Sequence, residues 1–227
     1  MGMIALGVLV SGGGTNLQAI LDAIEAKTLD ARVSVVVSNV PGAGALVRAE
    51  KAGVPTVVVD HRAFSDRPSF DAAIVSELQQ RGVDYVVLAG FMRLVTPTLL
   101  DAFPMRIVNV HPALLPAFPG VNAQAQALRY GVCVSGCTVH FVDRGTDTGP
   151  IIAQAVVPVL ASDDEESLKK RILAQEHALL PRVLQWCAEG RVRVEPAEGE
   201  REGERVRVVV QGVESPATGV AGVAGAR

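Results

Sequence analysis

Aromatic residues are scarce in this chain: they make up 4% of its 227 residues, although 49% of the residues are apolar. A core with so few large rings must be built mainly from Val, Leu, Ala and Ile. Cysteine is rare as well, and three cysteines fit a reducing compartment, where disulfides seldom form. At this length the chain can bury most of its apolar surface, as one large domain or two small ones.

Basic runs and long apolar runs are also missing. The formal net charge is -3 and no Lys/Arg-rich segment offsets it, so a general nucleic-acid binder is not expected. The first residues, Met1–Ile4, lack the charged region and cleavage pattern of a signal peptide. Gly, Ser or charged residues interrupt the apolar runs before they reach membrane-spanning length. We therefore expect a cytoplasmic protein that binds neither nucleic acid nor membrane.

Cys133 and Cys137 lie close together, with His140 nearby, and such a group could belong to a metal site. The usual Cys-x-x-Cys spacing and a second ligand pair are missing, so we expect no metal and a small buried residue within a strand. His140 lies within a predicted strand and is expected to be a core residue or a support for site residues. Of the other histidines, His61 is expected at the surface, and His177 follows Glu176 on a helix without an assigned role.

Strand-like and helix-like segments alternate through the first half of the chain. Nearly continuous apolar strands separated by helices indicate a parallel sheet covered on both faces. The predicted strands are Ile4–Val10, Val33–Ser38, Thr56–Val59, Tyr85–Ala89 and Ile107–His111. The predicted helices carry Leu17 to Ile24, Ala43–Ala52 and Phe70 to Leu78, and a short one begins at Thr96-Pro97.

The second half differs from the first. Strands Ser135–Phe141 and Ile151–Val157 are joined by a loop too short for a crossover, which favours antiparallel pairing. A long helix opens at Ser162 with acidic residues in its first turns and runs toward Glu189, with Pro181 as a break or kink. The predicted fold is α/β: a Rossmann-like, open, mostly parallel sheet with helices on both faces and an antiparallel addition in the C-terminal half.

The segment Ser11–Asn16 (Ser-Gly-Gly-Gly-Thr-Asn) lies between the first strand and the first helix. Backbone N–H groups at a helix start, with no Cβ in the way, form an anion site. Leu17 stands where a dinucleotide fingerprint has its third Gly, and Ser38-Asn39 offers no acid for a ribose, which disfavours a dehydrogenase. The loop predicts a monophosphate site, with a tight turn that binds nothing as the alternative.

Asn109 and His111 end the fifth predicted strand, before Pro112. Alternation along a strand points both side chains the same way. An amide can hold an oxyanion and an imidazole can move a proton, so the pair could act on a carbonyl. We expect Asp147, in the loop Asp143–Pro150, to reach His111, keep it protonated and fix its tautomer. A structural histidine and a solvated turn are the alternatives.

These motifs resemble those of the phosphoribosylglycinamide formyltransferases, folate-dependent enzymes of purine synthesis. The resemblance runs from about Ile4 to Arg193. It is carried by Ser11–Gln18, Ala89–Arg93, Asn109–Gly120, Thr138–Phe141, Asp147–Pro150 and Gln175–His177. The Asn-x-His-Pro segment with the later Asp is shared by relatives that transfer or hydrolyse a formyl group, whereas the Gly-rich opening and the length select the glycinamide enzyme.

The resemblance implies that the amine of glycinamide ribonucleotide takes the formyl group of 10-formyltetrahydrofolate, a co-substrate, with no metal or nucleotide cofactor. Asn109 and protonated His111 would stabilise the oxyanion, His111 would move a proton to the folate nitrogen, and Asp147 would orient His111. The ribonucleotide would bind to Gly14, Thr15, Asn16 and Glu176. The folate would lie along Arg67, Met92, Arg93, Leu94, Val95, Asn109, Asp143, Arg144, Gly145 and Thr146.

The resemblance also implies the domain organisation. Residues 1–195 would form the catalytic domain, with a phosphate-binding half (about 1–105) and a folate and catalytic half (about 106–195). Residues 196–227 are expected to form a C-terminal extension that the resemblance does not cover. The residues themselves predict a hairpin, in which the alternating segments Arg191–Val194 and Arg205–Val210 pair around the charged stretch Glu198–Glu204, and then a disordered tail from Gly212. The protein would be a monomer or a homodimer. Many relatives carry histidines where this chain has Val121-Asn122-Ala123-Gln124, and Asn122 could still donate a hydrogen bond there.

Three other functions share parts of this sequence pattern. A 10-formyltetrahydrofolate hydrolase would be expected to carry an additional N-terminal regulatory domain, and this chain begins directly at its first strand. A methionyl-tRNA formyltransferase would need a basic C-terminal domain, which the acidic, Gly-rich tail does not supply. A non-catalytic folate- or phosphate-binding module would keep the glycine loop but need not keep Asn109, His111 and Asp147 together.

Overall fold

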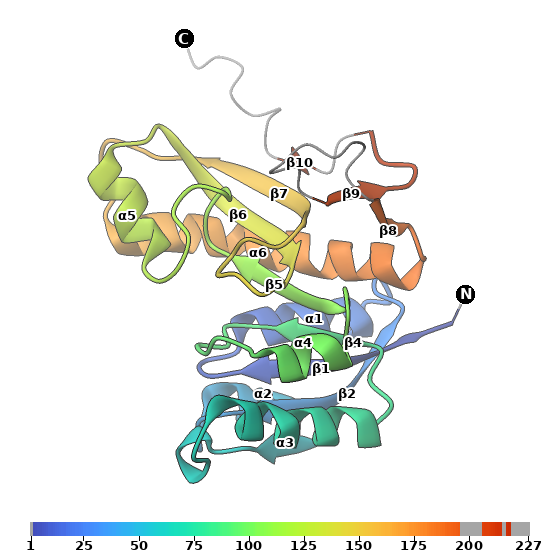
Figure 1. Ribbon diagram of the computed structural model, residues 1–227. Coiled ribbons are helices and arrows are strands. Elements are labelled where there is room, and N and C mark those ends of the chain that lie inside the picture. The colour runs from blue at the N-terminus through green and yellow to red at the C-terminus, as the bar shows by residue number, and fades with distance from the viewer. Residues whose placement is uncertain (1, 196–205, 215–216, 219–227) are drawn as a thin grey trace.

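One sheet of eight strands, in the order β10-β7-β6-β5-β4-β1-β2-β3, organises the chain in the computed structural model, which describes residues 2–195, 206–214 and 217–218 (Figure 1). Its strands are β1 (Ile4–Val10), β2 (Ala31–Ser38), β3 (Thr56–Val58), β4 (Tyr85–Leu88), β5 (Ile107–His111), β6 (Val134–Phe141), β7 (Ile151–Pro158) and β10 (Ala217–Thr218). The helices are α1 (Thr15–Glu25), α2 (Gly44–Lys51), η1 (His61–Ala63), α3 (Arg67–Gln80), α4 (Pro97–Ala102), α5 (Ala123–Tyr130) and α6 (Glu165–Ala188).

The pairing confirms the predicted architecture. Strands β1 to β5 run parallel, β6 pairs antiparallel with β5, and β7 pairs antiparallel with β6. Several strand ends differ from the prediction, those of β6 and β7 by one added residue each. Strand β2 begins at Ala31 because Ala31 and Arg32 already pair with β1, although a charged side chain interrupts the apolar run there. Strands β3 and β4 each end one residue earlier than expected, at Val58 and Leu88.

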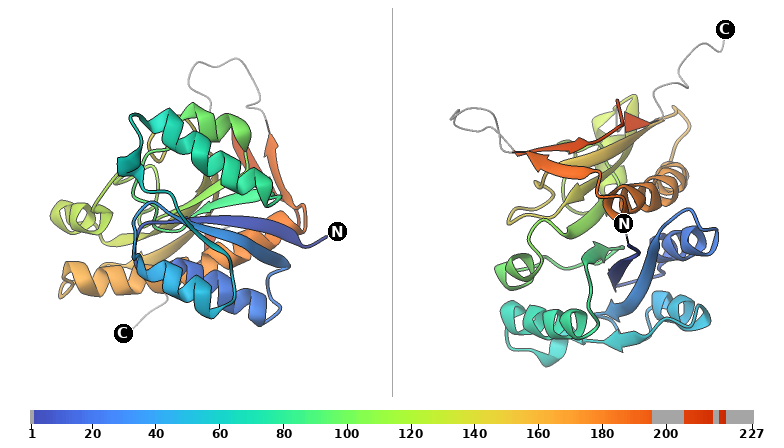
Figure 2. Two further views of the ribbon diagram at one scale, coloured as in Figure 1. Left: turned by 90° about the horizontal axis from the view of Figure 1, so that it is seen from below. Right: turned by 90° about the vertical axis from the view of Figure 1, so that its right-hand side faces the viewer.

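The two helix layers lie on opposite faces of the sheet, α1, α2 and α6 on one and α3 and α4 on the other (Figure 2). Alternation along the strands produces this division. In β1, Leu6, Val8 and Val10 pack on the side of α1 and α6, whereas Leu9 packs on the side of α3. Strands buried on both faces need apolar residues at nearly every position, as the sequence predicted.

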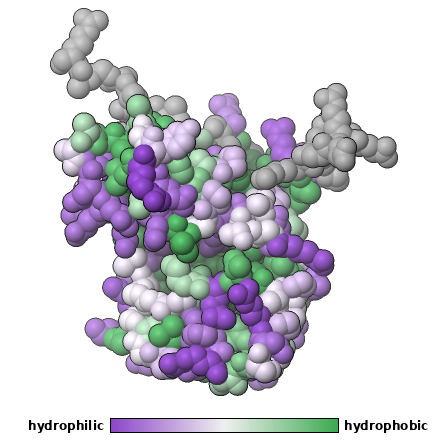
Figure 3. Space-filling view, turned by 60° about the vertical axis from the view of Figure 1, so that its left-hand side comes forward, coloured by the Kyte–Doolittle hydropathy of each residue, from purple (hydrophilic) through white to green (hydrophobic). Residues whose placement is uncertain are grey.

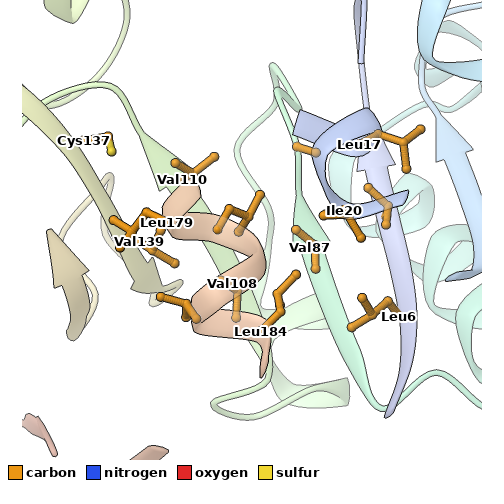
Figure 4. Packing of buried hydrophobic residues seen from close by; sticks show 14 of the residues in the cluster. Leu6, Leu17, Ile20, Val87, Val108, Val110, Cys137, Val139, Leu179 and Leu184 are labelled. Carbon is orange, nitrogen blue, oxygen red and sulfur yellow. The ribbon is translucent and has the colours of Figure 1, made fainter. Parts of the chain in front are cut away.

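The larger core cluster joins the two halves of the chain. Leu17 and Ile20 of α1 pack toward the sheet near Leu6, and Leu179 and Leu184 of α6 pack on the strands of the second half (Figure 4). All of these side chains are almost completely buried, and burial of each aliphatic side chain contributes about 1.5–3 kcal/mol relative to exposure. The core therefore relies on aliphatic packing, as the scarcity of aromatics required.

Helix α6 corrects two predictions. It begins at Glu165 rather than Ser162, because Asp164 caps it by accepting the Ser167 N–H at 2.8 Å, while the Ser167 hydroxyl accepts the Asp164 N–H. Pro181 does not break the helix, which continues for 24 residues. Pro181 is itself buried, and the apolar neighbours packed on the sheet on both sides of it offset the one backbone hydrogen bond that proline cannot donate.

The C-terminal part also departs from the prediction. Strand β8 (Val192–Glu195) pairs antiparallel with β9 (Arg207–Val210), as the alternating pattern predicted, and Val210 reaches the main core. The disordered tail predicted from Gly212 is wrong for Ala217–Thr218, which form β10 and pair parallel with β7. The backbone groups at the edge of β7 favour such pairing whatever the composition of the added segment. The charged stretch 198–204 and the remainder of the predicted tail, 215–216 and 219–227, lie outside the described residues.

Within the described residues, no helix is both long and apolar enough to cross a membrane. The face of the molecule in Figure 3 mixes hydrophilic and hydrophobic side chains. Isolated apolar side chains on such a face are ordinary for a folded domain.

Gly136 in β6 gives a test of the strand packing. A Cβ there would lie 1.9 Å from the Ala155 carbonyl oxygen, which is backbone and cannot rotate away. We expect Gly136→Ala to destabilise the protein by about 1–3 kcal/mol, as overpacked cores do, measured by thermal or urea unfolding. Gly12→Ala is the control, because nothing lies within 4 Å of its Cβ position. Equal stability of the two variants would contradict this packing.

Candidate active site

The carboxyl ends of β1, β4 and β5 lie level with one another at one edge of the sheet. Leu9 pairs with Leu88, and Leu88 pairs with Asn109. Strands in a sheet are about 4.8 Å apart, so the loop after β1 lies roughly 10 Å from the end of β5. The strand order reverses between β1 and β4, and open α/β sheets bind ligands in the crevice at such a point.

Two elements bring His140 to the predicted pair. Asn109 and His111 lie in β5, and the antiparallel strand β6 places His140 opposite Asn109 and Thr138 opposite His111. His111 is 4% exposed and His140 2% exposed. The sequence predicted His140 as a core residue, which is confirmed. Its position beside Asn109 depends on strand register, which sequence spacing does not reveal.

The contact predicted between His111 and Asp147 is confirmed. The His111 Nδ1 atom lies 3.3 Å from Asp147 Oδ2, and the His140 Nε2 atom lies 3.8 Å from Asp147 Oδ1. The loop leaves β6 level with Ile107 of β5 and must fold back toward His111. A tight turn makes this possible, since Asp143 accepts hydrogen bonds from the Gly145 N–H and the Thr148 hydroxyl.

Hydrogen bonds fix the tautomer of His140. Its Nδ1 lies 2.8 Å from the carbonyl oxygen of Phe141, which can only accept, so Nδ1 carries the proton. Its Nε2 then accepts from the Asn109 amide nitrogen at 3.1 Å. Burial lowers the pKa of His140, although the bond to Phe141 opposes this, so the ring is neutral at neutral pH. A neutral His140 can thus orient the Asn109 amide.

The segment 118–122 encloses the other side of His111. The His111 Nε2 atom lies 2.8 Å from the Phe118 carbonyl oxygen, and the Gly120 N–H donates to Asp147 Oδ2 at 2.8 Å. Phe118, Gly120 and Asn122 all have positive φ angles, which make this wrap tight. Residue types do not predict the roles of Phe118 and Gly120 in the site, because their backbone groups make these contacts. Asn122 caps α5 without a side-chain hydrogen bond.

The glycine loop is built for close approach. Gly14 has a φ of 75°, and a Cβ there would lie 2.5 Å from the Ala45 side chain, so only Gly fits. Helix α1 begins directly after it, at Thr15. On the outer side, Arg48 donates through Nε to the Gly13 carbonyl oxygen at 2.8 Å. A cavity of about 420 Å³ beside the loop is lined by Thr15, Gln18, Ala19, Asp22, Arg48 and His177.

Two predicted ribonucleotide residues are in direct contact. The buried Asn16 donates through its amide nitrogen to Glu176 Oε2 at 2.8 Å, which links α1 to α6. Glu176 is 6% exposed. Burial raises the pKa of the Glu176 carboxyl, and the hydrogen bond from Asn16 opposes the rise. A buried acid at the end of a phosphate-type loop is suited to accept hydrogen bonds from hydroxyl groups of a ligand.

Apart from Asn109 in β5, the predicted folate residues lie in three segments. Met92 and Leu94 are exposed, at 74% and 55%, in the segment after β4. Arg93 stacks on Phe70 at 5.5 Å, and Arg67 is the first residue of α3. Both arginines lie near the buried Asp71. Burial raises the pKa of the Asp71 carboxyl, and the positive charges of the arginines oppose this rise.

In the third of these segments, 143–146, the exposed Arg144 pairs with Asp101 at 3.5 Å. Gly145 and Thr146 are exposed, so this surface can be reached by a ligand.

All three cysteines are free. Cys137 is buried in the core and Cys133 is exposed. Among the described residues, no three His, Cys, Asp or Glu side chains are grouped in a way that could hold a metal ion.

Several known proteins are similar to the chain. It is 41% identical over 199 residues to phosphoribosylglycinamide formyltransferase of Escherichia coli K12, covering 88% of this chain and 94% of that protein. It is 47% identical over 191 residues (83% of the chain) to the trifunctional purine biosynthetic protein adenosine-3 of Drosophila melanogaster, but spans only 14% of its length.

Solved structures agree with these relatives. The crystal structure of glycinamide ribonucleotide transformylase 1 from Symbiobacterium toebii matches with a TM-score of 0.85 and 53% identity, covering 91% of this chain and 94% of that one. Residues 5–184 match the model of the formyl transferase family. Fold, sequence and site geometry thus agree, and the chain belongs to the formyl transferase family.

Proposed function

We propose that this protein transfers the formyl group of 10-formyltetrahydrofolate to the amine of 5-phosphoribosylglycinamide, giving formyl-phosphoribosylglycinamide and tetrahydrofolate in purine biosynthesis. The observation that carries the proposal is the ion pair between His111 Nδ1 and Asp147, beside Asn109. A binding module would have no need of this arrangement. The names of the relatives that match over nearly their whole length support the same reaction.

His111 supplies charge and a proton in this proposal. The Phe118 carbonyl oxygen can only accept, so Nε2 keeps its proton. The second proton of an imidazolium would then reside on Nδ1, beside the Asp147 carboxylate that stabilises it. Nδ1 is therefore the atom that exchanges a proton during the reaction.

The reaction proceeds through a tetrahedral intermediate. The substrate amine attacks the formyl carbon, and the carbonyl electron pair moves to the oxygen. That oxyanion accepts hydrogen bonds from protonated His111 and from Asn109, whose amide nitrogen has a second proton beyond the one donated to His140. The bond from carbon to the folate nitrogen then breaks. The amine loses one proton and the folate nitrogen gains one, with His111 passing it on.

The two substrates would bind on either side of this group. The phosphate would lie on Gly14, Thr15 and Asn16 at the start of α1, and the ribose hydroxyls would donate to Glu176. The folate would lie along Arg67, Met92, Arg93, Leu94, Val95, Asn109, Asp143, Arg144, Gly145 and Thr146. No metal or nucleotide cofactor takes part in this scheme. The protein would act in the cytoplasm as a monomer or homodimer, within a catalytic domain formed by residues 1–195.

A direct assay tests the reaction. Purified protein is mixed with 10-formyltetrahydrofolate, with and without phosphoribosylglycinamide, and tetrahydrofolate release is followed by absorbance and by mass spectrometry of the products. We expect release that depends on the ribonucleotide, with one formylated product per folate. Equal release without the ribonucleotide would indicate a hydrolase, and no release would indicate a binding module.

The His111–Asp147 pair is tested by substitution. We expect His111→Ala and Asp147→Asn to lower kcat by about 10²–10⁴, the range for loss of acid–base catalysis, and to change KM much less. Glu189→Gln is the control, since Glu189 pairs with Arg191 at the C-terminal end of α6, outside the proposed substrate-binding residues. An unchanged kcat and pH–rate profile in Asp147→Asn would show that the pair does not act in catalysis.

Glu176 provides a test through stability. Folding raises the pKa of the Glu176 carboxyl above its unfolded value of about 4.3. Between the unfolded and the folded pKa, the unfolded state binds fewer protons than the folded state. The free energy of unfolding therefore falls as pH rises through this range. Glu176→Gln removes this term. The Tm of the variant minus that of the wild type should therefore increase from pH 4 to pH 7.5.

The contrasting control is Glu189→Gln. Arg191 lowers the pKa of Glu189, so the same difference should run in the opposite direction, weakly because the pair is solvent-exposed. If Glu176→Gln gave a difference independent of pH, Glu176 would not be a strained buried acid.

A further inference from the structure

A line of hydrogen bonds crosses the carboxyl ends of four neighbouring strands, apart from the group around His111. The sheet order β4-β1-β2-β3 places the segments after these strands side by side. Met92 follows β4, Ser11 follows β1, Asn39 follows β2, and His61 lies beyond β3. The line therefore runs from the edge of the sheet to the exposed segment 92–95.

Ser11 lies at the centre of this line. Its hydroxyl donates to Asn39 Oδ1 at 2.6 Å and accepts the Met92 N–H at 2.8 Å. Its own backbone N–H donates to the Gly90 carbonyl oxygen at 3.2 Å. One residue thus makes two bonds to the segment after β4, of which only one needs the side chain.

Asn39 sets the direction of the Ser11 hydroxyl. Its Oδ1 can only accept, so the Ser11 proton must point to it, which leaves the oxygen lone pairs for the Met92 N–H. Asn39 is 4% exposed. The His61 Nδ1 atom lies 3.0 Å from the Asn39 carbonyl oxygen and 3.3 Å from the Asn39 side-chain nitrogen, so the far end of the line is held as well.

The bond between Ser11 and Met92 spans the point where the strand order reverses. Connections diverge there and leave a crevice for ligands. On one side, Ser11 is followed directly by the glycine loop. On the other side, Met92 and Leu94 point outward and are mostly exposed, so packing does little to fix them. Phe91 and Val95, on either side of them, pack on the core beside α3. The bond from the Met92 N–H to Ser11 ties the backbone between these two anchors to the loop after β1.

We propose that Ser11 is a positioning residue for the folate co-substrate: from the phosphate side of the crevice, its hydroxyl anchors the segment 92–95. This inference rests on the proposed function. A residue adjacent to the ribonucleotide loop then controls the binding of the other substrate, because its side-chain bonds go to Met92 and Asn39.

The test compares Ser11→Ala with Ser38→Ala. Ser38 is a matched control: it ends β2, is fully buried, and its hydroxyl also donates to a backbone carbonyl (2.8 Å) and accepts a backbone N–H (3.1 Å), both of Val40. We expect Ser11→Ala to raise the KM for 10-formyltetrahydrofolate about five- to tenfold, the effect of losing one hydrogen bond, and to leave the KM for the ribonucleotide nearly unchanged. Ser38→Ala should change neither constant.

Three results would overturn the positioning role: an unchanged folate KM in Ser11→Ala, an equal rise in both KM values, or the same folate effect in Ser38→Ala. Wild-type turnover is measured first. Absence of wild-type transfer would reject the proposed function, whereas wild-type transfer with an unchanged folate KM in Ser11→Ala would reject the positioning role alone.

A second measurement needs no substrate. Hydrogen exchange of the Met92 amide should be faster in Ser11→Ala than in the wild type and in Ser38→Ala, because only that variant removes its acceptor. Equal exchange in all three proteins would contradict the anchor, whether or not the protein transfers a formyl group.

Discussion

The ion pair between His111 and Asp147 is the interaction on which the rest of the site depends. A carboxylate beside a 4%-exposed imidazole is costly to desolvate, and it is retained only because other groups satisfy both partners. The Phe118 carbonyl holds the far nitrogen of the ring, and the Gly120 N–H bonds the carboxylate. The tight wrap at 118–122 and the turn at 143–148 therefore serve one purpose, which is to surround this imidazole and this carboxylate.

A second buried polar contact fixes the other end of the site. Asn16 and Glu176 join the start of α1 to the middle of α6, and thus the two halves of the chain. Glu176 is held at a cost, since burial opposes its ionisation. In the proposed function a ribose would provide the donors that this carboxyl lacks. Ser11 adds the third connection, between the loops after β1 and β4.

Much of the fold follows from residue patterns. The apolar runs locate β1 to β5, and the short connection between β6 and β7 gives their antiparallel pairing, because both signals are local. The errors are also local in origin. Helix α6 begins after Asp164 and not at Ser162, because Asp164 makes the capping box with Ser167. It continues through Pro181, because the packing of the neighbouring side chains offsets the missing hydrogen bond. The disordered tail was predicted from composition alone. Composition does not reveal that residues 217–218 pair with the edge of β7.

By itself, the sequence determined which residue types are available: an amide and an imidazole two apart on one strand, a glycine loop before a helix, and an acid in a later loop. Alternation along a strand and the lack of Cβ atoms are properties of short segments, so these features can be read directly. Only the tertiary structure decided that Asp147 meets His111, that His140 orients Asn109, and that Phe118 and Gly120 complete the group. Those contacts depend on strand register and on backbone atoms brought together from distant parts of the chain, and neither leaves a mark in the spacing of residue types.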